Sequence, residues 1–68
     1  MVLRAIRHRK GLTLKALAKK AGGMSYTFLS NIETGKADPS LSTLRRLAHA
    51  LEVSVSDLVK DENPTPRR

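Results

Sequence analysis

The side chains best suited to bind another molecule are the 13 lysines and arginines, which outnumber the 6 acidic residues and give a net charge of +7. Residues 1–46 hold ten bases and two acids, a net +8, whereas residues 47–68 hold three bases and four acids, a net −1. This separation of charge indicates a basic face that binds a polyanion and a near-neutral end that makes a different contact.

Residue types used in catalysis are present but are not grouped in a usable pattern. Cysteine is absent, so disulfides and cysteine-rich zinc sites are excluded. His8 and His49 lie in separate segments without a second ligand at metal-binding spacing, and the acidic residues form no pair suited to acid and base work. Gly22-Gly23 lacks the following Lys and Ser or Thr of a phosphate-binding loop. We therefore expect that the protein is not an enzyme and that it binds no cofactor and no metal.

Apolar side chains recur at helical spacing, and no segment alternates with the two-residue period of a strand. The pattern predicts an all-α domain of five short helices over residues 1–60. The first helix ends at Gly11, and the other four begin at residues of N-capping type. These are Thr13, Ser25, Ser40 and Ser54.

The ends of the helices are indicated by glycine and proline. Gly22 and Gly23 end the second helix, and Gly35 ends the third. A loop follows, because Pro39 disfavours helical geometry at Asp38. Residues 61–68, with two prolines and no apolar anchor, are expected to form a disordered tail.

Two short helices joined by a glycine turn, the second capped by serine and polar on its outer face, form a helix-turn-helix pattern. Further marks at matching spacing are Arg7, Gly11-Leu12-Thr13, Leu17-Ala18, Ala21-Gly22, Ser25, Leu29-Ser30, Ile32-Glu33, Gly35, Pro39-Ser40, Leu44, Leu47-Ala48 and Leu51. On these residues the chain resembles the phage repressor and Cro type of helix-turn-helix DNA-binding proteins. The resemblance implies a compact five-helix bundle of the lambda-repressor-like type, usually dimeric, whose third helix lies in the major groove.

If the third helix enters the groove by its N-terminal end, the side chains after Ser25 meet base edges. Tyr26, Thr27 and Asn31 are therefore the base-reading candidates. Asn can pair with adenine, Thr can donate, accept or touch a thymine methyl, and Tyr offers its ring or its hydroxyl. The alternative for Tyr26 is a partly buried ring at the surface, and for Thr27 and Asn31 it is ordinary solvated helix surface.

Contacts to the DNA backbone are expected from cations and one hydroxyl on the basic part of the chain, together with backbone amides after Gly35. The candidates are Arg9, Lys15, Lys19, Ser30, Lys36, Arg45 and Arg46. For each cation the alternative is a solvated face.

The resemblance assigns Arg7 and Glu33 a different role, as a pair that ties the first helix to the end of the third. Two positions depart from the family pattern. Leu14 stands where many members have a phosphate-binding Gln, so that contact is not carried over and packing is expected instead. The turn before Ser25 is one residue longer than usual, and we expect the loop to absorb the extra glycine, Gly23.

The near-neutral end offers apolar candidates for a dimer interface, some of which must belong to the core of one protomer. These are Val53, Val55, Leu58 and Val59. A 68-residue chain is only marginally stable alone, so dimerisation would help.

The expected function is sequence-specific binding of double-stranded DNA by a small dimeric transcriptional regulator, a repressor acting on a palindromic operator. One alternative is an antitoxin-type module that neutralises a partner protein, and another is a basic bridging module without sequence preference. No apolar run exceeds three residues, so we expect no membrane segment, no signal peptide and a cytoplasmic, nucleoid-associated protein.

Overall fold

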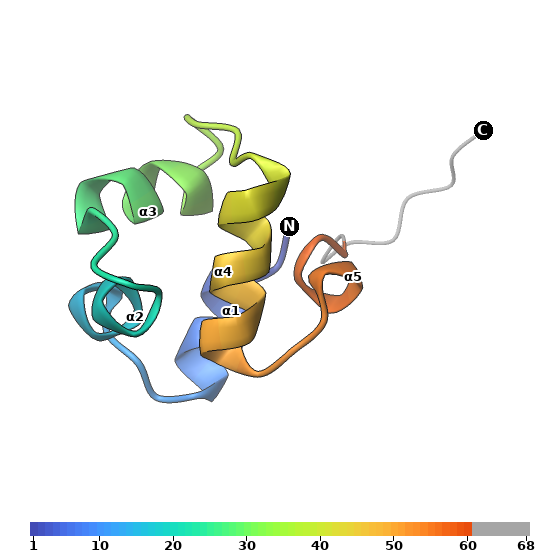
Figure 1. The fold of residues 1–68 in the computed structure, drawn as a ribbon, viewed down its shortest axis with the longest axis horizontal. Coiled ribbons are helices and arrows are strands. Elements are labelled where there is room, and N and C mark those ends of the chain that lie inside the picture. Colours follow the sequence, from blue (N-terminus) through green and yellow to red (C-terminus); the bar gives the residue numbers. More distant parts are fainter. Residues whose placement is uncertain (61–68) are drawn as a thin grey trace.

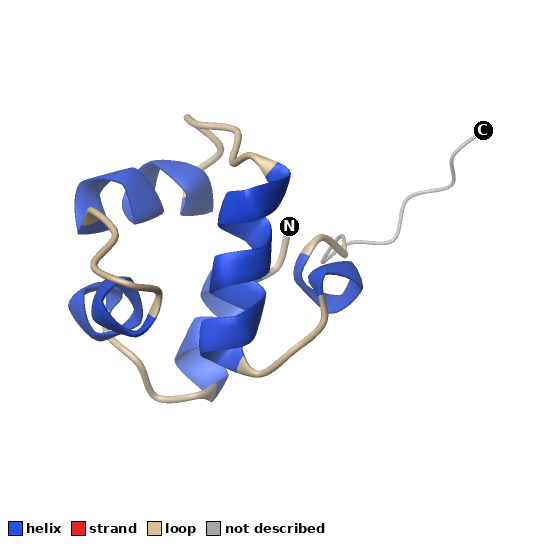
Figure 2. Ribbon diagram, viewed as in Figure 1, coloured by secondary structure: helices blue, strands red, loops and turns tan. Residues whose placement is uncertain are grey.

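The computed structural model describes residues 1–60, which form five α-helices and contain no strand (Figure 2). The helices are α1 (Leu3–Arg9), α2 (Leu14–Lys20), α3 (Tyr26–Glu33), α4 (Leu41–Leu51) and α5 (Val55–Leu58). The predicted all-α class is therefore confirmed. The tail expected at residues 61–68 lies outside the described residues. Among the described helices, none is long and apolar enough to cross a membrane.

Four of these helices begin where a side-chain oxygen accepts a backbone N–H at the N-terminus. Thr13 Oγ1 accepts from Ala16 at 3.0 Å, and Ser25 Oγ accepts from Phe28 at 3.3 Å. Ser40 and Ser54 cap α4 and α5 in the same way, with oxygen–nitrogen distances of 3.2 and 3.0 Å. Each cap satisfies an N–H that has no partner inside its helix, so the four predicted helix starts are confirmed.

The end of α4 differs from the ends of α1, α2 and α3 because no glycine follows the helix. Glu52 adopts the left-handed conformation with φ of 60°. Its N–H donates to the His49 carbonyl at 3.1 Å, and the Val53 N–H donates to the Ala48 carbonyl at 3.0 Å. This bond pattern ends helices at glycine in most proteins. The carbonyls of α4 are thus satisfied at the expense of backbone strain in Glu52.

Leucines from all five helices form the core of the domain. The six largest fully buried side chains are Leu3, Leu17, Leu29, Leu47, Leu51 and Leu58. Figure 1 shows α4 between the α2–α3 pair and α5. The N-terminal segment is joined to α5 by a hydrogen bond of 3.1 Å from the Val2 N–H to the Leu58 carbonyl. The core therefore fixes α2 and α3 against one side of α4.

Burial corrects one residue expected at a dimer interface. Leu58 has 0% relative exposure and belongs to the core of a single protomer, because α5 turns this side chain toward α4. Val53 and Val55 are partly buried and pack against the same core. Val59 is the exposed member of the set, at 45%.

Candidate nucleic-acid interface

Helix α3 presents a polar face because its apolar side chains are anchored in the core. Leu29 is 0% and Ile32 is 4% exposed, which fixes the rotation of the helix about its axis. Tyr26, 52% exposed, and Thr27 are turned to solvent at the N-terminal end of α3, and Asn31 is half-buried one turn beyond Thr27. Within residues 1–60 none of these three side chains is used in a hydrogen bond. Their polar atoms are available to an outside partner.

The C-terminal end of α3 is held to α1 by an ion pair. Arg7 Nε donates to Glu33 Oε2 at 2.6 Å and Arg7 Nη2 donates to Glu33 Oε1 at 3.2 Å. The two side chains are 9% and 5% exposed. Arg7 Nη1 also donates to the Leu12 carbonyl at 2.8 Å, so the guanidinium joins α1, the loop after it and α3. Such a forked pair fixes orientation as well as distance.

Two predicted backbone-contacting cations lie beside the start of α3. Lys15 and Lys19 on α2 line an open hollow of about 520 Å³ with Tyr26 and Met24. Both lysines are exposed. The structure therefore brings Lys15, Lys19 and the base-reading candidate Tyr26 to one surface.

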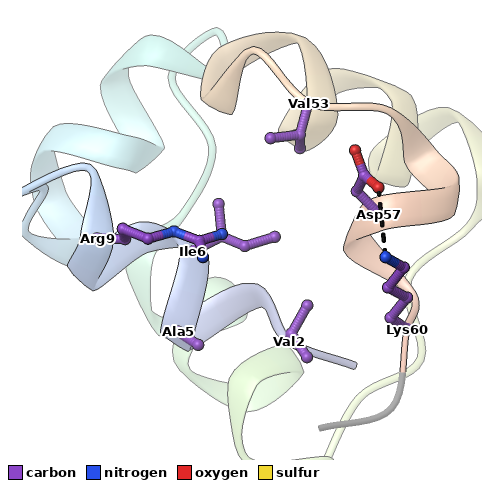
Figure 3. A pocket seen from close by; sticks show the side chains of 7 residues that line it. All are labelled: Val2, Ala5, Ile6, Arg9, Val53, Asp57 and Lys60. Carbon is purple, nitrogen blue, oxygen red and sulfur yellow. Dashed lines mark ion pairs between the residues drawn. The ribbon is translucent and has the colours of Figure 1, made fainter.

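The other backbone-contacting candidates are distributed differently. Lys36 is exposed in the loop after α3, Ser30 is half-buried on α3, and Arg45 is exposed on α4. Arg9 lines another groove, of about 490 Å³, between α1 and α5. Figure 3 shows Arg9 in this groove with Val53, while Asp57 and Lys60 form an ion pair of 3.9 Å at its far side. Arg9 is thus not gathered with the lysines of α2.

Arg46 differs from its sequence expectation, because its guanidinium is bonded to carbonyls of the protein. It donates to the Ala21 carbonyl from Nε at 3.1 Å and from Nη2 at 2.7 Å. The end of α2 lies within reach of this side chain of α4, which the order of residues along the chain does not reveal. Arg46 is itself exposed, so its predicted phosphate contact stays a prediction beside this contact with the turn.

The turn between α2 and α3 absorbs its additional residue in two left-handed glycines. Gly22 has φ of 94° and Gly23 has φ of 84°. The N–H groups of Gly23 and Met24 both donate to the Ala18 carbonyl, at 3.0 and 2.9 Å. Helix α3 still begins directly after Ser25. Leu14, the other departure from the pattern, packs against the core as expected.

Comparison with known proteins matches residues 3–58 to the helix-turn-helix family. The chain is 41% identical over 58 residues to the HTH-type transcriptional regulator DdrOP3 of Deinococcus deserti, covering 85% of this chain and 44% of the relative. It is 43% identical over 60 residues to the immunity repressor protein of Bacillus phage phi105, covering 88% and 41% respectively.

A shorter relative is matched over most of its length. The uncharacterized HTH-type transcriptional regulator y4dJ of Sinorhizobium fredii is 39% identical over 61 residues, which cover 90% of this chain and 78% of the relative. By contrast, the chain spans less than half the length of the Deinococcus and phage relatives. The five-helix fold and these matches agree with the resemblance found in the sequence. The chain belongs to the helix-turn-helix family, of the phage repressor and Cro type.

Proposed function

We propose that the protein is a transcriptional regulator that binds double-stranded DNA in a sequence-specific manner, with α3 in the major groove. The observation that supports this most directly is the polar face of α3. The side chains of Tyr26, Thr27 and Asn31 make no hydrogen bond within residues 1–60, although α3 itself is anchored at Leu29 and Ile32. A rigid helix with unused donors and acceptors is suited to base edges.

The charges around α3 support the same partner. Lys15 and Lys19 flank the N-terminal end of α3, and Lys36 lies in the loop after it. Cations in these positions would contact phosphates on either side of the groove, and such contacts fix the register of a protein on DNA. The names of the relatives, transcriptional regulators and a phage repressor, favour repression as the outcome of binding.

The proposal includes a symmetric dimer on a palindromic operator. Two copies of α3 must then be about 34 Å apart to enter successive major grooves on one face of the DNA. The interface candidates are Val59 and the half-buried Val53 and Val55. In this role the protein would act in the cytoplasm, on the nucleoid.

The test is selection of bound duplexes from a random pool at about 150 mM salt, followed by titration of the selected duplex against a scrambled one. We expect a palindrome bound at least about 10³-fold more tightly than the scramble, the lower range for specific binders. Equal affinities would overturn the proposal and would leave an electrostatic or partner-directed module.

Two variants and a control connect the result to α3. Asn31→Ala should relax selectivity at one base pair by about 5-fold to 150-fold, the equivalent of 1–3 kcal/mol. Lys19→Ala should weaken binding to both duplexes and lower the salt slope by about 0.9. Ser56→Ala, an exposed site on α5, is the matched control and should bind as the original protein does.

A further inference from the structure

Arg46 lies on α4, but its guanidinium contacts the two residues that directly follow α2, Ala21 and Gly22. Nε and Nη2 both donate to the Ala21 carbonyl, at 3.1 and 2.7 Å, and Nη2 is 3.5 Å from the Gly22 carbonyl. The Ala18 and Lys19 carbonyls already accept the N–H groups of the turn. Arg46 therefore binds the Ala21 carbonyl and approaches the Gly22 carbonyl, at the point where the chain leaves α2 for α3.

The geometry at Gly22 shows how closely the guanidinium approaches the turn. A Cβ added to Gly22 would lie 2.8 Å from Arg46 Nη2, closer than van der Waals contact permits. Gly22 also has φ of 94°, which a residue with a side chain rarely adopts. The backbone conformation therefore favours glycine, while a side chain at this position would require the end of the flexible Arg46 side chain to move from the turn.

The turn is also held by its own backbone hydrogen bonds to the Ala18 and Lys19 carbonyls, and Ala21 and Met24 on either side of it pack with the core. Between them, Gly22 and Gly23 both have positive φ, and a Cβ at Gly23 would meet nothing within 4 Å. Glycine has the widest conformational freedom of all residues, and these two contribute no side chain to define the turn. The contact from Arg46 supplies a restraint directly before the N-terminal end of α3.

We propose that Arg46 is a positioning residue, which fixes the α2–α3 turn from α4 and so orients the N-terminal end of α3. The Arg7–Glu33 pair holds the opposite end of the same helix. Only the expected effect of Arg46 on DNA specificity rests on the proposed function, DNA binding by α3. The restraint on the turn is a property of the free protein.

The DNA test compares Arg46→Ala and Arg46→Lys with the matched control Arg45→Ala, the exposed neighbour on α4. We expect both Arg46 variants to bind the selected duplex roughly tenfold more weakly, since lysine keeps the charge but lacks the planar fork. Binding to the scrambled duplex and the salt slope should stay unchanged. Arg45→Ala should instead weaken both duplexes alike and lower the slope by about 0.9.

The opposite pattern would overturn the proposal. If Arg46→Ala weakens both duplexes equally and lowers the salt slope, and if Arg46→Lys restores binding, Arg46 is a phosphate ligand. Unchanged specificity in Arg46→Ala would also refute the positioning role.

A measurement without DNA separates this inference from the proposed function. Hydrogen exchange of the Gly22, Gly23 and Met24 amides should be at least about fivefold faster in Arg46→Ala and unchanged in Arg45→Ala, because exchange reports local opening of the turn. Unchanged exchange in Arg46→Ala refutes the restraint whatever the DNA result. If the original protein does not prefer the selected duplex, the proposed function fails while the exchange result still decides the role of Arg46.

Discussion

Removal of the Glu33 carboxylate should destabilise the domain more than any change at its surface. In Glu33→Ala the Arg7 guanidinium, whose side chain is 9% exposed, loses its acidic partner and keeps the 2.8 Å bond to the Leu12 carbonyl. Loss of one member of a buried ion pair costs about 3–5 kcal/mol. The remaining bond favours the lower value, about 3 kcal/mol. For a domain of this size, that corresponds to a fall in Tm of about 12–24 °C.

Urea unfolding followed by circular dichroism at 222 nm measures this loss, with thermal melts as a second probe. The control is the double variant Arg7→Met with Glu33→Leu, which removes both charges and keeps similar volume. We expect its free energy of unfolding to lie within about 1 kcal/mol of the original, because no buried charge is left unpaired. The reasoning is refuted if Glu33→Ala costs less than about 1 kcal/mol. It is also refuted if the double variant is as unstable as the single one.

Four further changes test the helix ends and the near-neutral end of the chain. Glu52→Gly should raise the free energy of unfolding by about 0.5–1 kcal/mol, since it removes left-handed strain at φ of 60° at some cost in entropy; a lower value in urea unfolding would contradict this. Ser25→Asp should keep the α3 cap, with stability within about 0.5 kcal/mol, but weaken DNA binding about tenfold by repelling phosphate; unchanged affinity in a titration would remove Ser25 from the interface. Leu58→Ala should lose about 3 kcal/mol at any protein concentration, because it leaves a cavity in the core. Val59→Asp should change only the dimer dissociation constant measured by sedimentation, so a comparable loss of monomer stability would show that Val59 belongs to the core.

The starts of the helices could be predicted because their cause is local. Thr13, Ser25, Ser40 and Ser54 each bond an N–H three residues later, so the relevant atoms lie within one turn of the sequence. The end of α4 was harder to place. Glu52 adopts the left-handed conformation that is typical of glycine, so its residue type did not predict a helix end there. The hydrogen bonds to two carbonyls of α4 compensate for the backbone strain in Glu52.

The near-neutral end could be predicted only as a set of residues. Helix α5 has only four residues, so Val55 and Leu58 within it and Val59 directly after it are too few to define a face by periodicity. The structure separates them by degree of burial, since Leu58 is covered by α4 while Val59 remains 45% exposed. The direction of a short helix is set by tertiary packing, which its own residues do not encode.

The adjacent pair Arg45 and Arg46 shows that neighbouring cations can have different bonding partners although both are exposed. Successive residues of an α-helix point about 100° apart, so two neighbouring arginines cannot face the same partner squarely. Both side chains are exposed on α4, and the Arg46 guanidinium also bonds the Ala21 carbonyl, 25 residues earlier in the chain. A bond from a side chain to a distant backbone atom leaves no trace in residue spacing. The adjacent glycines Gly22 and Gly23 predict a flexible turn from the sequence alone. They do not predict that Arg46 is the residue that contacts it.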